Sequence, residues 1–236
     1  MDNKQKDLTR CSQDRVSVFV ESIITEGSGL LRELEREALD RDVPIIRPRT
    51  RGLLQLLLTI HRPARILEVG TAIGYSALAM RETAIQEGFA CSITTIERDA
   101  ARAQEARRNL DRAGAGEGEC TISLIEGNAA QILEELEGTF DFIFLDAAKG
   151  QYIHFLPALK RLLAAGGVMV SDNVLRGGDI LNSHYLVTRR NRTIHKRMRE
   201  YLRALMEDPA LRTVILEMED GAAVSVKRAF VQEQDI

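Results

Sequence analysis

From residue 65 onward, short apolar segments alternate with longer segments in which apolar residues recur at helical spacing, and this alternation limits the folds open to the chain. The short segments predict strands at 65–69, 92–96, 121–125, 140–145, 168–171, 213–217 and 222–227. The longer ones predict helices at 75–87, 100–113, 129–137, 152–164 and 188–207. Strands that alternate with crossover helices pair in parallel, so we expect an α/β fold with a Rossmann-like, doubly wound sheet of seven strands.

The two ends of the chain depart from this alternation. Asp220-Gly221, between the last two strands, is a tight hairpin signal, so we expect these strands to form an antiparallel pair. The first sixty residues show helical periodicity, broken by an extended segment at 43–48 and followed by a helix expected at 50–60. No linker divides the chain. We therefore predict one domain over 1–236, with a helical N-terminal extension at 1–62 and a Rossmann-like core at 63–230.

The composition excludes several classes of protein. With 44% apolar and 28% charged residues, the chain has neither the bias of a disordered protein nor that of a fibrous one. Its three widely spaced cysteines fit neither a secreted disulfide framework nor a zinc cluster. The apolar runs are far shorter than the ~20 residues of a membrane span, and the N-terminus lacks the apolar segment of a signal peptide. We therefore expect a cytoplasmic protein that does not contact membranes.

A glycine-bearing loop follows the first predicted strand. Gly70 and Gly74 stand between this strand and the next helix, where doubly wound folds cradle nucleotide-like ligands. The G-x-G-x-x-G fingerprint of dinucleotide-binding oxidoreductases is missing, because three residues separate the two glycines. The spacing favours a ligand without phosphates, such as S-adenosylmethionine. The alternative is a tight strand–helix turn that binds nothing.

The next two strands end in further candidate ligand residues. Glu97 lies 27 residues after Gly70, where such folds place a carboxylate on ribose hydroxyls. A carboxylate can accept hydrogen bonds from both hydroxyls of a vicinal diol. Asp99 is placed to cap the following helix, which leaves Glu97 for the ligand. Asn128 and Ala129 follow the third strand, where we expect contacts to an adenine ring, although Gly-Asn is also an ordinary turn.

Oxygen ligands follow two further strands at the same edge of the predicted sheet. Asp146 ends the strand at 140–145, with Lys149 three residues on, and Asp172-Asn173 ends the strand at 168–171. Two carboxylates and an amide, without a neighbouring thiolate or histidine, favour a hard divalent cation, Mg²⁺ or Mn²⁺, over Zn²⁺. The alternatives are a simple turn at Asp172 and a solvated side chain at Lys149.

Basic residues cluster although the formal net charge is −3. Seven of them crowd the helix expected at 188–207, where an apolar stripe leaves them facing outward, and Arg47, Arg49, Arg51 and Arg176 lie near the other motifs. Clusters of this kind favour contacts to a phosphate backbone, but a coenzyme A thioester or a merely solvated helix face would also explain them. The predicted RNA contacts are Arg47, Arg49, Arg176, Arg189, Arg190, Arg192, Lys196 and Arg197.

Several motifs together resemble a known enzyme family. They are Val43-Pro44-Ile45-Ile46, ILEVGTAIGYSALAM at 66–80, TIERD at 95–99, FDFIFLDAAKGQY at 140–152 and VSDNVLRGG at 170–178. From about residue 16 to residue 228 the chain resembles the cation-dependent S-adenosylmethionine O-methyltransferases, the group of the catechol and caffeoyl-CoA O-methyltransferases. Within it, the chain is most similar to bacterial tRNA 5-hydroxyuridine methyltransferases. The resemblance implies a homodimer.

The resemblance also implies roles for individual residues. Asp146, Asp172 and Asn173 would bind the metal, and Lys149 would be the catalytic base next to Asp146. The expected cofactor site comprises Ile46, Glu68, Gly70, Thr71, Ser76, Glu97, Arg98, Asn128, Ala129 and Asp146. One departure weakens the catechol interpretation: catechol methyltransferases carry a Trp beside the metal-binding acid, whereas Ala147-Ala148 follows Asp146 and the chain contains no Trp.

The expected methyl acceptor is 5-hydroxyuridine at the wobble position of the tRNA anticodon stem-loop. Its ring hydroxyl and neighbouring carbonyl are two adjacent oxygens that one cation can bind. A small phenolic substrate, such as a catechol or a caffeoyl-CoA-like compound, offers two adjacent oxygens as well. The predicted site therefore does not choose between these acceptors.

Overall fold

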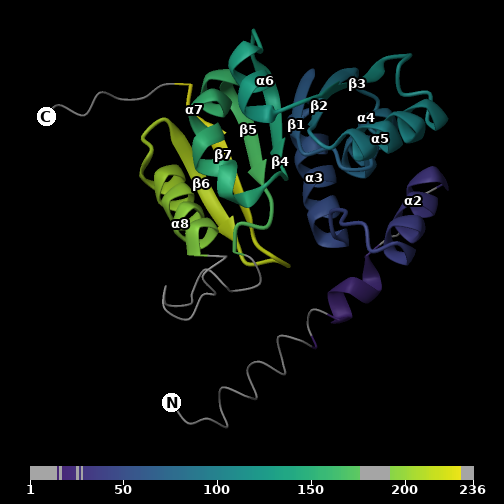
Figure 1. Ribbon diagram of the computed structural model, residues 1–236, viewed down its shortest axis with the longest axis horizontal. Helices are drawn as coiled ribbons and strands as arrows, with labels where there is room; N and C mark the ends of the chain where they lie inside the picture. Colours follow the sequence, from purple (N-terminus) through teal and green to yellow (C-terminus); the bar gives the residue numbers. More distant parts are fainter. Residues whose placement is uncertain (1–14, 16–17, 25–26, 28, 176–191, 230–236) are drawn as a thin grey trace, which may run out of the picture.

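A computed structural model describes residues 15, 18–24, 27, 29–175 and 192–229. Its centre is one sheet with the strand order β3-β2-β1-β4-β5-β7-β6 (Figure 1). The strands are β1 (Arg65–Val69), β2 (Cys91–Glu97), β3 (Cys120–Glu126), β4 (Phe140–Leu145), β5 (Leu163–Ser171), β6 (Leu211–Leu216) and β7 (Ala222–Lys227). The reversal of strand order beside β1 places the carboxyl ends of β1 and β4 next to each other, where open α/β sheets bind their ligands.

The pairing of the strands confirms the predicted fold class. β1, β2, β3, β4 and β5 pair in parallel, whereas β7 is antiparallel to both β5 and β6. The expected tight hairpin is wrong in detail, because Leu216 pairs with Ala222 and the connection spans residues 217–221. Gly221 is in this connection at φ 83° and Glu219 is also left-handed, at φ 50°.

Helices cover both faces of the sheet. On one face lie α2 (Gly29–Asp40), α3 (Pro48–His61), α4 (Tyr75–Gln86) and α5 (Ala100–Arg112). On the other lie α6 (Ala129–Glu135), α7 (Tyr152–Leu162) and α8 (Arg192–Glu207), with the 3₁₀ turn η1 (Lys149–Gln151) before α7. Alternate strand residues serve the two cores: Ile66 packs with the first group and Leu67 with the second.

Most element boundaries agree with the periodicity, with two exceptions. β5 begins at Leu163, directly after α7, rather than at residue 168. The first part of β5 contains Gly166 and Gly167, and the apolar run that predicts a strand begins only at Val168. The start expected for the last long helix, residue 188, lies outside the described residues, and α8 is described from Arg192.

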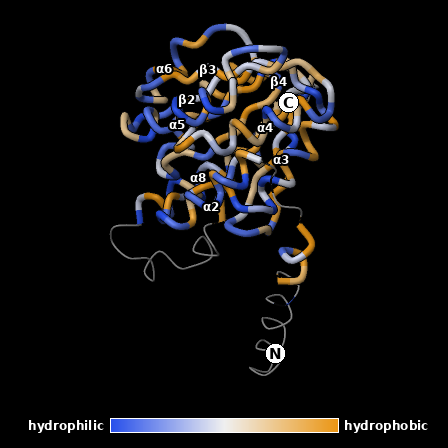
Figure 2. The backbone as a smooth tube through the Cα atoms, turned by 90° about the vertical axis from the view of Figure 1, so that its right-hand side faces the viewer, coloured by the Kyte–Doolittle hydropathy of each residue, from blue (hydrophilic) through white to orange (hydrophobic). Residues whose placement is uncertain are grey.

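The N-terminal helices are fastened to the sheet domain by buried polar contacts. The Arg51 side chain, 3% exposed, donates to Glu35 Oε2 at 2.9 Å and to the Tyr75 hydroxyl at 2.6 Å, which joins α3 to α2 and α4. Residues 18–23 form a short helical segment that stands apart from the body of the domain and is mainly apolar (Figure 2). Within the described residues, none of the helices has the length and apolar character that crossing a membrane requires.

Candidate active site

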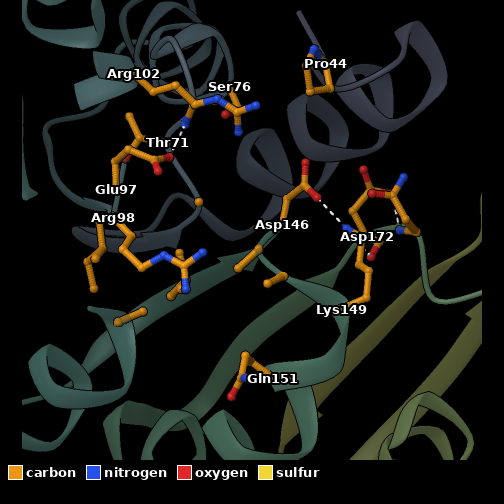
Figure 3. Close-up of a pocket in the computed structure, with 18 of the residues that line it drawn as sticks. Pro44, Thr71, Ser76, Glu97, Arg98, Arg102, Asp146, Lys149, Gln151 and Asp172 are labelled. Carbon is orange, nitrogen blue, oxygen red and sulfur yellow. Dashed lines mark hydrogen bonds and ion pairs between the residues drawn. The ribbon is translucent and has the colours of Figure 1, made fainter. Parts of the chain in front are cut away.

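A cavity of about 940 Å³ opens at the carboxyl edge of the sheet. Its walls are the loops after β1, β2, β3, β4 and β5, together with the extended segment around Ile46 (Figure 3). This is the volume of a pocket for a cofactor and a small reacting group, and its position is the one that open α/β folds use for ligands. Of the predicted cofactor residues, all but Glu68 line this cavity.

The loop after β1 approaches the loop after β4 closely. A Cβ atom on Gly70 would lie 2.0 Å from the backbone oxygen of Asp146, and Gly70 has φ 108°. Gly74, at φ 89°, is the N-cap residue of α4 and gives the helix no side-chain cap. The first glycine therefore permits a backbone contact that any side chain would prevent, and the second turns the chain into the helix.

Glu68 lies beneath this loop rather than in the cavity wall. Its carboxyl accepts hydrogen bonds from the Ser76 and Thr95 hydroxyls, each at 2.5 Å. Because Thr95 donates its proton to Glu68, it accepts from the Thr71 hydroxyl at 2.5 Å. Complete burial is the main cause that raises the pKa of Glu68 to about 7. Glu68 thus acts on the cavity through Ser76 and Thr71, which do line it.

Glu97 is held firmly at the opposite side of the loop. Its Oε2 accepts from the Ala72 N–H at 2.9 Å and its Oε1 accepts from the Asp99 N–H at 2.8 Å. Asp99 caps α5 by accepting from the Arg102 N–H, as its position predicts. Since each Glu97 oxygen has lone pairs beyond its backbone bond, the carboxylate can still accept from a diol in the cavity.

The remaining predicted cofactor residues complete the wall. Ile46 is buried, and Arg98 and Ala129 line the cavity from the loops after β2 and β3. Asn128 lines it too, but its Oδ1 accepts from the Ala130 N–H and caps α6. Asn128 therefore caps α6 and also lines the cavity, and its contact to an adenine ring stays a prediction.

At the other end of the cavity, four predicted catalytic and metal-binding residues come together. Lys149 Nζ donates to Asp146 Oδ1 at 2.6 Å, to the Tyr152 hydroxyl at 3.0 Å and to the backbone oxygen of Asp172 at 3.5 Å. Figure 3 shows Asp146, Lys149 and Asp172 directed toward one another. Asn173 lies in the same wall and has the left-handed φ of 55°, a strained conformation typical of functional loops.

The charge of this cluster is partly uncompensated. Asp172 is 3% exposed, and its burial, followed by the negative charge of Asp146, raises its pKa to about 7. Across the described part of the chain, no three His, Cys, Asp or Glu side chains gather as a ready metal cluster. The cluster offers two carboxylates and the Asn173 amide, which are the hard oxygen donors that Mg²⁺ and Mn²⁺ take.

Three residues of this region were not predicted. Tyr152 is fully buried, and its hydroxyl donates toward the backbone oxygens of Leu145 and Asp172, at 3.1 and 3.2 Å, while it accepts from Lys149. Its spacing of three residues from Lys149 was a usable signal. The Thr50 hydroxyl contacts Asp172, and Glu219, 169 residues further along the chain, contacts that hydroxyl; no local pattern indicates either contact.

The predicted RNA contacts divide into three groups. Arg176, Arg189 and Arg190 lie outside the described residues. Arg47 is exposed at the rim of the cavity, where it pairs with Asp220 at 3.1 Å, and Arg49 is half-buried, 3.8 Å from Glu21. On α8, Arg192 is half-buried, Lys196 is exposed, and Arg197 donates to the Gly150 backbone oxygen at 3.2 Å. Arg51, part of the same basic segment, is buried in the domain and unavailable to a ligand.

Comparisons with known proteins agree with this fold and site. Residues 21–228 match the sequence profile of a family described as O-methyltransferase. The chain is 35% identical to the catechol O-methyltransferase of Niastella koreensis over 143 residues, which are 59% of this chain and 62% of that protein. It is 28% identical to the caffeoyl-CoA O-methyltransferase of Stellaria longipes over 185 residues, 75% of this chain and 74% of that one.

A solved structure extends the similarity to three dimensions. The SAH-bound methyltransferase PaMTH1 of Podospora anserina superposes with a TM-score of 0.79 at 28% identity, over 92% of this chain and 95% of that one. The matched segments cover only 62% and 56% of the catechol O-methyltransferases of Niastella koreensis and Mycobacterium tuberculosis. The fold is that of the Rossmann-like methyltransferase structures to which the chain is similar. The chain belongs to the O-methyltransferase family that its residues 21–228 match, which confirms the family resemblance.

Proposed function

We propose that this protein is a divalent-cation-dependent O-methyltransferase that methylates 5-hydroxyuridine at the wobble position of tRNA to 5-methoxyuridine. The observation that carries the proposal is the meeting of Asp146, Lys149, Asp172 and Asn173 at one end of a cavity whose other end is formed by the Gly70 loop and Glu97. A cofactor at one end and an acceptor at the other fit the transfer of a small group between them.

S-adenosylmethionine fits the residues of the first end. Glu97 has lone pairs for the two ribose hydroxyls, and Ser76 and Thr71 offer hydroxyls beside the Gly70 backbone. The SAH carried by the related Podospora structure supports this ligand, since SAH is the demethylated cofactor. When bound, the cofactor supplies an activated methyl group on a good leaving group. The protein must then align and deprotonate the acceptor.

A divalent cation fits the second end. Asp146, Asp172 and Asn173 would hold it, because a cation would compensate the charges of the two carboxylates. Burial, followed by the charge of Asp146, raises the pKa of Asp172. Such an ion, held by two adjacent acceptor oxygens as well, would lower the pKa of the acceptor hydroxyl. Lys149 Nζ, which donates to Asp146 Oδ1 at 2.6 Å, lies beside the proposed cation site and would take the hydroxyl proton after losing one of its own, while its hydrogen bond to the Tyr152 hydroxyl holds the side chain in place.

The surroundings of the cluster support an RNA acceptor. Helix α8 packs against η1, and a Cβ on Gly150 would lie 3.6 Å from Ile194 and 3.9 Å from Arg197. The basic side of α8 is therefore next to the turn that carries Lys149, and Arg47 stands at the cavity rim. Phosphates flanking a methylated base would meet these cations. Since tRNA acts in the cytoplasm, the proposal carries a cytoplasmic location with it.

A small phenol is the second candidate acceptor, because several relatives are catechol and caffeoyl-CoA O-methyltransferases. The catechol and the 5-hydroxyuridine both place two oxygens next to each other. The absence of Trp from the chain disfavours the catechol, because a Trp beside the metal-binding acid would pack on its flat ring; Tyr75 and Phe155 are aromatic residues that do line the cavity.

The two acceptors are separated by one assay run in parallel on tRNA containing 5-hydroxyuridine and on catechol. We expect the wild type to prefer tRNA, with activity lost in excess EDTA and restored by Mg²⁺ or Mn²⁺. The double substitution Arg192→Gln with Lys196→Gln should flatten the salt dependence of tRNA binding, by roughly 0.7–0.9 in log–log slope per lost phosphate contact. Arg107→Gln with Arg108→Gln, on exposed α5 across the molecule, is the matched control (Figure 1).

Three results would contradict parts of the proposal. Full activity in excess EDTA would show that the reaction needs no divalent cation. If the wild type prefers catechol and the α8 variant keeps the wild-type salt slope, the methyl acceptor is a small phenol and not tRNA. An equal decrease in the salt slope of tRNA binding in the α8 and α5 variants would mean that the overall charge of the protein, and not α8, binds the RNA.

A further inference from the structure

A buried threonine hydroxyl lies between two carboxylates at the floor of the site. Thr50 Oγ1 is 2.8 Å from Glu219 Oε2 and 3.4 Å from Asp172 Oδ1, and Thr50 is 2% exposed. The Asn173 N–H donates to the same Asp172 oxygen at 2.8 Å. Both contacts meet one oxygen of the carboxylate, so together they fix its rotation and leave Oδ2 for another ligand.

Glu219 reaches this position from the connection between β6 and β7. Besides the hydroxyl, its carboxylate accepts from the Arg49 N–H at 3.0 Å and from the Thr50 N–H at 3.1 Å. Glu219 has φ 50°, in the left-handed region that residues with a side chain rarely adopt. The surrounding structure therefore holds Glu219 in a conformation that it would not adopt alone.

The same connection is also tied to the segment that follows Asp172. The Val174 N–H donates to the Gly221 backbone oxygen at 2.9 Å, and the Leu175 N–H donates to that of Asp220 at 2.8 Å. A Cβ on Gly221 would lie 2.3 Å from Leu175, so only glycine allows the two segments to pack this closely. The β6–β7 connection thus contacts the segment after Asp172 through its own backbone, and Asp172 itself through Thr50.

We propose that Thr50 and Glu219 are positioning residues for Asp172: Glu219 holds Thr50 in place, and the single hydroxyl proton of Thr50 is donated in a three-centre hydrogen bond to Glu219 Oε2 and Asp172 Oδ1, which fixes the orientation in which Asp172 presents its second oxygen to a cation. The inference rests on the proposed function, in which Asp172 is a metal ligand. Residues that hold a metal ligand through a hydrogen bond change metal affinity by about 10–100-fold when they are removed. Neither residue touches the reacting atoms.

A purely structural role makes a different prediction. Arg47, the N-cap residue of α3, makes no side-chain cap hydrogen bond, and Glu219 satisfies two N–H groups of the first turn instead. If this capping is the whole role of the contact, losing the hydroxyl of Thr50 changes little, because the Thr50 N–H still reaches Glu219. The substitution Thr50→Val keeps the side-chain shape and removes only the hydroxyl.

The experiment titrates the full-length protein with Mn²⁺ alone and follows the free ion by electron paramagnetic resonance. We expect Thr50→Val to weaken Mn²⁺ binding about tenfold or more, with Thr50→Ser restoring it to within about twofold of the wild type. Thr59→Val is the matched control, since Thr59 is on the same helix and its hydroxyl donates only to the Gln55 backbone oxygen at 2.9 Å. Its Mn²⁺ affinity should equal that of the wild type.

Further measurements separate the outcomes. S-adenosylmethionine affinity, measured by calorimetry, should be unchanged in Thr50→Val, because the Gly70 loop and Glu97 do not contact Thr50. A Thr50→Val protein with a lower melting temperature but wild-type Mn²⁺ affinity would overturn the inference and leave Glu219 as a helix cap. If the wild type and Asp172→Ala bind Mn²⁺ equally, Asp172 is not a metal ligand. The cation site of the proposed function is then wrong, and so is the positioning role of Thr50 and Glu219.

Discussion

Glu68 and Glu97 lie in neighbouring strands of the same sheet, and their surroundings give their charges different uses. Glu68 is completely buried, so its charge is costly and its pKa rises to about 7. Glu97 keeps partial contact with solvent and accepts two backbone N–H groups. The first is suited to holding hydroxyls in place and the second to binding an uncharged diol, since a backbone-anchored carboxylate loses little freedom when the ligand arrives.

Replacing Glu97 should weaken cofactor binding more than replacing any other exposed acidic residue at this edge of the sheet. Glu97→Ala removes the acceptor of two ribose hydroxyl bonds, and we expect S-adenosylmethionine binding to lose on the order of 2–4 kcal/mol by calorimetry. Glu126→Ala is the matched control, because Glu126 pairs in register with Glu97 but lies outside the cavity wall. Unchanged affinity in Glu97→Ala would show that the ribose is bound elsewhere.

The raised pKa of Glu68 predicts a specific pH dependence of stability. Its folded-state pKa, about 7, lies above the unfolded value of 4.5, so the folded protein binds more protons between these pH values and loses stability as pH rises through them. Glu68→Gln removes this loss. Relative to the wild type, the variant should gain on the order of 3 kcal/mol between pH 4.5 and 7 and no more above pH 7. Urea unfolding at a series of pH values measures the difference in the free energy of unfolding between variant and wild type. A difference that does not change with pH would contradict the raised pKa of Glu68.

At the scale of elements, the contact between the loops after β1 and β4 connects the two ends of the cavity. Gly70→Ala would place a Cβ 2.0 Å from the Asp146 backbone oxygen, at φ 108°. We expect this variant to lose roughly 2–5 kcal/mol in urea unfolding, the sum of backbone strain and overpacking. Gly114→Ala is the control, since Gly114 has φ 57° and open space around it; only the strain of about 1–2 kcal/mol should remain. Equal losses would mean that the loops do not constrain each other.

The sequence predicts elements well where their pattern is local. Apolar runs such as Phe140–Leu145 are strands because they are buried on both faces, and Asp99 caps α5 because capping needs only the residues of one turn. The cavity residues follow from the same logic, since strand ends of a parallel sheet meet at one edge. What could not be predicted depends on distant contacts: the burial of Arg51 between α2 and α4, and the arrival of Glu219 at Thr50.

At the scale of the whole molecule, apolar side chains remain exposed on the N-terminal side. Val18, Phe19 and Ile23 are 66%, 62% and 64% exposed, and Leu56 and Ile60 of α3 are 57% and 71% exposed. The segment 18–23 stands away from the sheet domain (Figure 2). Exposed apolar side chains gathered on short surface elements are typical of a protein interface, and we propose that they meet a second copy of the chain.

The proposed dimer predicts the mass of the protein in solution. The wild type should elute with a light-scattering mass about twice the 26.4 kDa of the chain. Phe19→Asp with Ile23→Asp should shift it to the monomer, because two charges placed in an apolar contact would be buried without partners. Met206→Asp is the control, since Met206 is 56% exposed on α8, on the other face of the sheet, and its variant should remain dimeric. A monomeric wild type, or a control that dissociates as readily as the double variant, would assign the exposed residues another role.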